Sequence, residues 1–191
     1  MEENTAMEIV DEVFLLYSEK GEEEYHGEPI SQLQHMLQAA TLAQNGNFDD
    51  ETILAAFFHD IGHLLGSNET MGSYGIKDHE RLGAQYLADR GFSEKIVQLV
   101  ASHVEAKRYF SAIDTSYYNR LSPASKATLE YQGGPMRQEE VKNFNKNPLK
   151  DIILKFRRWD EAAKVPGKET ISINALKNMA RRHLVNNSTQ D

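Results

Sequence analysis

Apolar residues recur at intervals of three and four along most of this chain, the spacing that gathers them on one face of an α-helix. In the first such segment, Val10, Val13, Phe14 and Tyr17 share one face. No segment of useful length alternates with the two-residue period of a β-strand, and there is no internal repeat or Gly-rich phosphate loop. The sequence therefore predicts an all-α fold.

Glycine and proline divide the helical pattern into separate segments, because neither residue suits the interior of a helix. A Ser, an Asp or a first-turn Pro stands where several of these segments begin. The 191 residues fit one domain, with a core over about 5–164, a C-terminal helix over about 169–185 and a frayed tail. The other predicted helices cover about residues 7–17, 29–44, 50–62, 78–90, 94–104, 123–132 and 148–164.

The chain contains no cysteine and seven histidines. The absence of cysteine excludes disulfides, thiolate zinc sites and iron–sulfur clusters, so a transition-metal site would consist of histidine and carboxylate. The net charge of −8 argues against sequence-independent binding to nucleic acid. No apolar run reaches the ~18–20 residues of a membrane helix, and no signal peptide is visible, so we expect a soluble cytoplasmic protein without a membrane partner.

Six histidine and aspartate side chains stand on or beside apolar helical faces. The focal pair is His59-Asp60, which follows the apolar run from Ile53 to Phe58. A single His-Asp pair is common by chance, and a lone histidine is more often a packed or surface residue than a metal ligand. Unpaired charges are expensive to bury, however, and helical bundles build metal centres from polar groups on several helices. The set is His35, His59, Asp60, His79, His103 and Asp160.

The order and spacing of this set resemble the HD-domain superfamily. The wider sequence resembles the small HD-domain mixed-valence di-iron oxygenases that cleave 2-amino-1-hydroxyethylphosphonate. Matching stretches include AAFFHDIGHL, HERLGAQYL, SHVEAKRY and RRWDEAAK, and together the matches cover most of residues 22–164. The resemblance implies a single compact HD-domain helical bundle that holds an Fe(II)/Fe(III) pair and uses O2 as co-substrate.

The resemblance also assigns the six side chains to two irons. Asp60 would bridge them, which suits the two oxygens of a carboxylate. The other ligands would be His35, His59 and Asp160 on the first iron, and His79 and His103 on the second.

Tyr25 and Glu28 lie three residues apart, just before the helix that carries His35. In the family, the matching tyrosine can occupy a coordination position while substrate is absent, and the matching glutamate takes part in its displacement. The resemblance therefore implies a substrate-dependent switch. Taken alone, the two residues are more typical of a turn tyrosine and a first-turn glutamate that favours the helix dipole.

A phosphonate dianion needs local positive charge in an acidic protein. Arg157 precedes Asp160 by three residues, so the two side chains share a helical face. Each candidate contact, taken alone, would be a solvated cation or an ordinary helix hydroxyl, but the family motifs point to the same positions. These substrate contacts are Lys107, Ser125, Thr128 and Arg157.

Two further positions are candidate substrate contacts. His63, four residues after His59, would orient the substrate, with a capping histidine as the alternative interpretation. Gln34, beside His35, stands where a close relative has an acidic residue. This departure points to a difference in how the substrate amine is bound.

The resemblance implies O2-dependent cleavage of the C–P bond of a 1-hydroxy-2-aminoethylphosphonate, with a free or N-methylated amine. The products would be phosphate and glycine or an N-methylated glycine, and a separate phosphonate hydroxylase would supply the substrate. One alternative is a metal-dependent HD phosphohydrolase acting on a small phosphate ester. Another is a metal or ligand sensor without enzymatic activity. Tyr25, Glu28 and the candidate phosphonate contacts favour the oxygenase.

Overall fold

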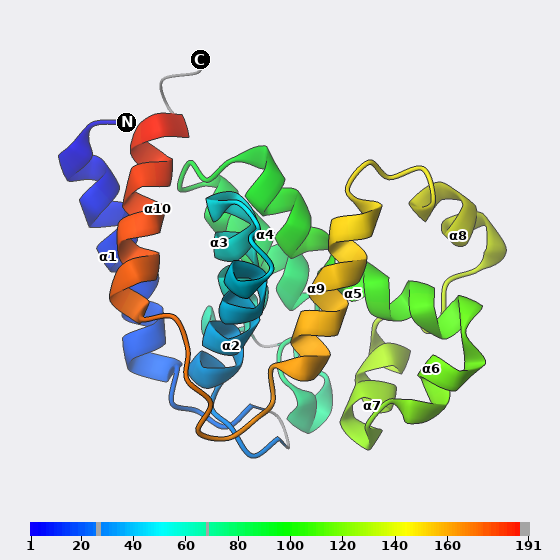
Figure 1. Cartoon of the computed structure of the whole chain (residues 1–191). Helices are drawn as coiled ribbons and strands as arrows, with labels where there is room; N and C mark the ends of the chain where they lie inside the picture. The colour runs from blue at the N-terminus through cyan, green and yellow to red at the C-terminus, as the bar shows by residue number, and fades with distance from the viewer. Residues whose placement is uncertain (26–27, 68, 188–191) are drawn as a thin grey trace.

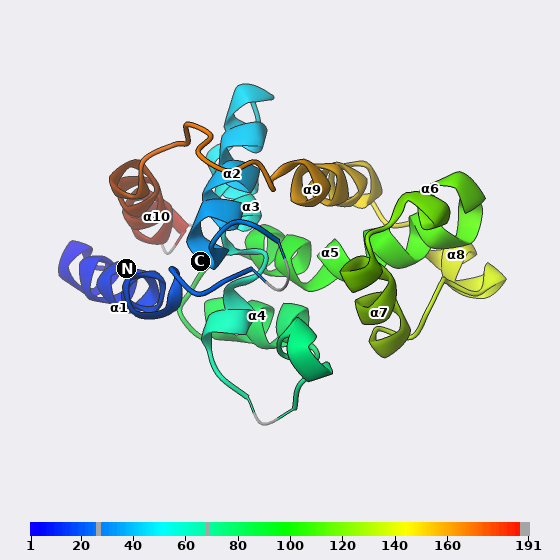
Figure 2. The same cartoon turned by 90° about the horizontal axis from the view of Figure 1, so that it is seen from below.

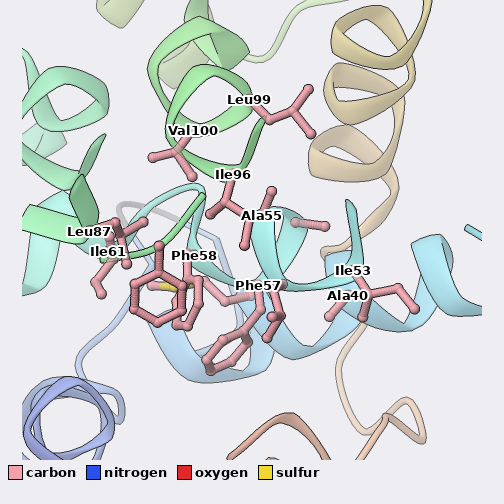
Figure 3. Packing of buried hydrophobic residues seen from close by; sticks show 14 of the residues in the cluster. Ala40, Ile53, Ala55, Phe57, Phe58, Ile61, Leu87, Ile96, Leu99 and Val100 are labelled. Carbon is pink, nitrogen blue, oxygen red and sulfur yellow. The ribbon is translucent and has the colours of Figure 1, made fainter. Parts of the chain in front are cut away.

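The hydrophobic core of the computed structural model is built around α3 (Asp50–Phe58), in which every residue from Thr52 onward is buried. A helix that is apolar on all sides needs neighbours on all sides. Contacts come from α2 (Gln32–Asn45), α5 (Glu94–Ile113) and α10 (Ile173–Asn187). Figure 3 shows how the side chains of α3 pack among those of neighbouring elements in this core.

The structure describes residues 1–25, 28–67 and 69–187. Within these ranges the chain forms ten α-helices, two short 3-10 helices and no strand, which confirms the predicted all-α fold. None of the described helices combines the length and the apolar character needed to cross a membrane. The remaining elements are α1 (Glu3–Lys20), η1 (Ile61–Leu64), η2 (Gly72–Tyr74), α4 (His79–Ala88), α6 (Thr115–Arg120), α7 (Pro123–Tyr131), α8 (Gln138–Phe144) and α9 (Lys150–Ala162).

The helices form a central group with an addition on each side (Figures 1 and 2). The first and last helices, α1 and α10, lie side by side at one end of the molecule. At the other end, α6 and α7 enclose a small apolar cluster of Tyr117, Leu121 and Leu129 that packs partly on Phe110 of α5. A hydrogen bond from Lys107 of α5 to Thr128 joins α7 to this group.

Several helix boundaries differ from the predicted ones, including those of α1, which runs from Glu3 to Lys20, and α3, which ends at Phe58. The helix predicted over 94–104 continues to Ile113, because Ala106 and Tyr109 extend its buried face. The helix predicted from Pro29 begins at Gln32, because Ser31 caps it and accepts a hydrogen bond from a backbone N–H. The C-terminal helix begins at Ile173 and not near 169. It continues through Asn187, so residues 185–187 of the predicted frayed tail are helical, and residues 188–191 lie outside the described ranges.

Two short helices were not predicted. In α6, the Asp114 side chain accepts hydrogen bonds from the backbone N–H groups of Ser116 and Tyr117. In α8, Glu140 accepts a hydrogen bond from the backbone N–H of Arg137. Each of these helices buries only one of its residues and lacks apolar periodicity. The hydrogen bonds at its N-terminus and the packing of that one residue therefore stabilise it.

Candidate metal centre

The four histidines of the predicted set point their Nε2 atoms at Asp60 from four different segments. His35 lies in α2, His59 follows the last residue of α3, His79 opens α4 and His103 lies in α5. The Asp60 Oδ2 atom is 3.5 Å from His35 and 3.3 Å from His59. The Oδ1 atom is 3.3 Å from both His79 and His103. Each carboxylate oxygen thus faces its own pair of histidines.

A backbone carbonyl fixes the orientation of each imidazole ring. A carbonyl oxygen can only accept a hydrogen bond, so each Nδ1 carries the ring proton and each Nε2 offers a lone pair. For His35, His59, His79 and His103, the carbonyls belong to Ala163, Ala56, Ile76 and Val100, at 2.9, 2.8, 3.2 and 2.7 Å.

The Nε2 atoms meet in pairs. Those of His35 and His59 are 3.1 Å apart, and those of His79 and His103 are also 3.1 Å apart. When both rings of a pair are neutral, the two Nε2 lone pairs cannot form a hydrogen bond, and all four rings are buried. A cation beside each pair resolves this conflict, as expected for metal-binding imidazoles.

The buried donors form two triads. In each triad, the three ligand atoms lie within 4.8 Å of one another. Imidazole and carboxylate together suit iron, manganese, zinc or nickel, so the donor set fits two such ions without choosing between them. The triads are His35, His59 and Asp160, and Asp60, His79 and His103.

A close contact between η1 and α4 brings the second triad together. A Cβ added to Gly62 would lie 1.9 Å from the backbone oxygen of His79. A Cβ on Gly83 would lie 2.9 Å from a side-chain carbon of Ile61. Because Gly62 has no side chain, α4 can begin this close to η1. This close packing places His79 beside Asp60.

The charges within the site favour ionised carboxylates. Burial alone would raise the pKa of Asp60, but His59 and the other histidines hold that pKa well below its usual range. Burial opposes the ionisation of Asp160 as well, and Arg157 and His35 outweigh it, so its pKa is also lowered. Both carboxylates are therefore negative at neutral pH and suited to a cation.

The pKa values of the two histidines of the first triad shift in opposite directions. Burial lowers the pKa of His35 to about 4. Burial also disfavours charged His59, but the adjacent Asp60 raises the pKa of His59 to about 9. His59 is therefore protonated at neutral pH while His35 is neutral. The positive charge on His59 lies where a bound metal ion would supply positive charge.

Tyr25 lies against the first triad. Its ring stacks on that of His35 with a centroid distance of 3.9 Å, and its hydroxyl is 3.5 Å from Asp160 Oδ1. Burial and the charge of Asp60 raise the pKa of Tyr25. Glu28 is held nearby by Lys164, whose Nζ is 2.8 Å from Glu28 Oε1.

A cavity opens beside the two triads, and most of the predicted substrate contacts line it. Lys107 donates a hydrogen bond of 2.8 Å to the Thr128 hydroxyl, and burial together with Arg157 lowers the pKa of this lysine to about 7. His63 stacks on His79 at 3.9 Å. The predicted contacts that reach the cavity are Tyr25, Glu28, His63, Lys107, Ser125, Thr128 and Arg157.

Arg157 joins the cavity to the metal centre. It forms an ion pair with Asp160, and its Nε donates a hydrogen bond of 2.7 Å to the Tyr117 hydroxyl. Burial disfavours a charged guanidinium, but Asp160 and other neighbours raise the pKa of Arg157, so the side chain stays positive.

Gln34 is the one predicted substrate contact that the structure does not bring to this cavity. Its side chain is exposed and lines an outer groove with Glu22, Glu24 and Ser31. Successive helical residues point about 100° apart, so a neighbour of the inward-facing His35 points elsewhere. The groove is also lined by Glu28, and the expected role of Gln34 in binding the substrate amine stays a prediction.

Two residues that belong to the site were not predicted from the sequence. Lys164 lines the cavity just after α9 ends at Ala162, and its position four residues after Asp160 was an available signal. Tyr117 holds Arg157 but lies in a segment without apolar periodicity, which gave no signal.

The chain matches one family model and is similar in sequence to several known proteins. A family model described as HD domain matches residues 32–156. The 1-hydroxy-2-(trimethylamino)ethylphosphonate dioxygenase (glycine-betaine-forming) of Leisingera caerulea is 41% identical over 167 residues, which cover 85% of this chain and 83% of that protein. The hydroxymethylphosphonate dioxygenase of Gimesia maris is 39% identical over 166 residues, covering 85% and 82%. An uncharacterised protein, L432 of Acanthamoeba polyphaga mimivirus, is 39% identical over 178 residues, covering 92% and 81%.

Proposed function

Because this chain belongs to the HD-domain family of phosphonate dioxygenases, we propose that it uses O2 to cleave the C–P bond of a small 1-hydroxyphosphonate. In the specific form proposed, 1-hydroxy-2-aminoethylphosphonate, with a free or N-methylated amine, reacts with O2. The products are phosphate and glycine or the N-methylated glycine. The hydroxyl-bearing carbon loses the four electrons that O2 requires, so no further reductant is needed.

The observation that carries the proposal is the sharing of Asp60 between two buried histidine pairs beside a cation-lined cavity. Both triads fit a transition metal, and the proposed occupants are an Fe(II)/Fe(III) pair. The irons would supply the one-electron chemistry that O2 needs. The ligands in the proposal are those of the two triads, with Asp60 bridging.

The protein's own residues would bind and orient the substrate. Lys107 and Thr128, already joined by a hydrogen bond, would bind phosphonate oxygens together with Ser125. Arg157 would add positive charge while it keeps Asp160 in place. Holding the reacting carbon at a fixed position beside the metals replaces a bimolecular encounter with an oriented one.

Tyr25 would cover the first metal site until substrate arrives. Its stacking on His35 and its hydroxyl near Asp160 support this role. Glu28, in the same turn, would move with it. His63, stacked on His79, would orient the substrate from the side of the second triad.

Oxygen dependence tests the proposal most directly. Iron-loaded protein is mixed anaerobically with hydroxymethylphosphonate and with 1-hydroxy-2-aminoethylphosphonates of increasing N-methylation, and O2 is then admitted. We expect one phosphate released for each O2 consumed. Phosphate release at full rate without O2 would identify a hydrolase, and two bound irons with no O2 uptake would identify a sensor.

The proposal also implies a supplier of the substrate. The 1-hydroxyl group must be introduced before this reaction, so a hydroxylase acting on the parent aminophosphonate is proposed as a functional partner. Co-incubation with such an enzyme should convert the parent compound to phosphate, which this protein alone should not do.

A further inference from the structure

Lys164 lies between two connected cavities and has no role in the function proposed above. The inner cavity, beside the triads, has a volume of about 70 Å³, and its neighbour has about 300 Å³. Glu28, Ser125, Arg157 and Lys164 line both. These four side chains therefore form the boundary that the two cavities share.

The charge of Glu28 is already matched by Lys164. The 2.8 Å contact joins two side chains that are 22% and 20% exposed, so solvent screens this ion pair only in part. A substrate cation that approaches Glu28 meets both the attraction of the carboxylate and the repulsion of the ammonium. The pair thus removes most of the advantage that Glu28 alone would give to a cationic substrate.

A primary ammonium and a trimethylammonium differ at this point. The primary ammonium has N–H donors and can bind the second oxygen of Glu28 while Lys164 keeps the first. A trimethylammonium has no N–H donor, so it cannot form this hydrogen bond to the second oxygen of Glu28. The trimethylated group is also the larger of the two.

Aromatic rings are the usual alternative for binding a quaternary ammonium. One face of the Tyr25 ring stacks on His35, and the Lys164 Nζ stands 5.5 Å from its centroid. Tyr117 packs on Phe110 with its hydroxyl bound to Arg157. Among the described residues that line the two cavities, Tyr74 is the other aromatic side chain, and a single ring does not form a cage.

We propose that Lys164 is a specificity-determining residue that makes this site favour a 1-hydroxyphosphonate whose amine keeps N–H donors over its trimethylated counterpart. The inference rests on the proposed function and narrows its substrate class. Hydroxymethylphosphonate, which has no amine, serves as a reference because nothing in it reaches Glu28.

The test compares kcat/KM for the primary amine, the trimethylated amine and the reference substrate. We expect wild-type protein to prefer the primary amine over the trimethylated one by at least about tenfold. Lys164→Gln should reduce that ratio by about tenfold. Without the lysine, the Glu28 carboxylate is no longer paired and can attract the permanently charged trimethylammonium group. Any change on the reference substrate measures effects of the variant that do not involve the amine, so the ratio between the two amines carries the test.

Two control variants keep the test specific. Lys164→Arg retains the charge and should retain the wild-type ratio. Lys155→Gln changes a lysine on α9 that faces the Phe48 ring and not the cavities, and it should leave every value unchanged. Thermal unfolding of each variant shows whether the fold is intact.

A wild-type preference for the trimethylated amine would overturn the inference, even if no variant folds. An unchanged ratio in folded Lys164→Gln would overturn it as well. If no substrate yields phosphate with O2, the proposed function fails. In that case, calorimetry without O2 measures the dissociation constants of the two amine substrates. Tighter binding of the primary amine in wild type, with a smaller difference in Lys164→Gln, would support the inference, and equal binding would overturn it.

Discussion

Arg157 and Asp160 form a buried ion pair one helical turn apart, on the wall shared by the substrate cavity and the first metal triad. The guanidinium is held in turn by the Tyr117 hydroxyl, so α6 contributes to the orientation of a candidate metal ligand on α9. A charge-paired carboxylate has one oxygen committed to the arginine and the other free to face the histidines. In the proposed function, the pair would therefore couple the binding of phosphonate to the geometry of the metal centre.

Replacing this arginine should weaken one metal site more than the other. Arg157→Lys keeps the charge but loses the planar fork that reaches Asp160 and Tyr117 together. We expect affinity at the first triad to fall by about 10–100-fold, with the second triad little changed. Iron titration followed by metal analysis measures both sites, and Arg158→Lys, at an exposed neighbour, is the matched control. Equal losses at the two sites would contradict this interpretation.

Removal of Asp60 should affect both sites. Its two oxygens face different histidine pairs at 3.3–3.5 Å, so no other single side chain can replace it. Asp60→Ala should bind neither metal stoichiometrically, as measured by metal analysis after gel filtration. Asp151→Ala, an exposed aspartate on α9, should bind as wild type does. Retention of two irons by the Asp60 variant would exclude a bridging role.

The candidate metal ligands could be predicted because each stands in or beside a helix that carries buried apolar residues. His35 and His103 lie among buried apolar residues on α2 and α5, where a polar side chain needs a specific partner. Their buried positions follow from helical periodicity alone. The pairing of Nε2 atoms around Asp60 was implied by family resemblance and is visible only in the folded chain.

Contacts between distant segments were harder to predict. Lys164 meets Glu28 across 136 residues, and Tyr117 meets Arg157 across 40. Such contacts depend on how short, capped helices such as α6 dock, and apolar spacing does not encode that docking. Gln34 is exposed beside the buried His35, because successive residues on a helix point about 100° apart.

Gly62 gives a prediction about packing. Gly62→Ala would place a methyl group against the backbone of His79, which cannot move without shifting the start of α4. We expect a loss of about 1–3 kcal/mol in the free energy of unfolding and weakened metal binding at the second triad. Chemical denaturation and metal analysis measure the two effects. Gly46→Ala, where the added carbon meets chiefly the Phe48 ring, should cost less. Wild-type stability in the Gly62 variant would contradict the packing argument.

Lys107 should make substrate capture depend on pH. Burial, followed by Arg157, lowers the pKa of this lysine to about 7, so the side chain is an ammonium below that pH and a neutral amine above it. Only the ammonium attracts a phosphonate dianion. The value of kcat/KM, which reports the free enzyme, should therefore fall by about tenfold per pH unit above about pH 7.

Lys107→Arg provides the decisive comparison. A guanidinium stays protonated across the accessible range, so the fall in kcat/KM should move to higher pH in this variant even if the maximum is lower. Steady-state phosphate release between pH 6 and pH 9, at constant ionic strength, measures both profiles. A flat wild-type profile, or the same falling limb in both proteins, would assign the pH dependence to a group other than Lys107.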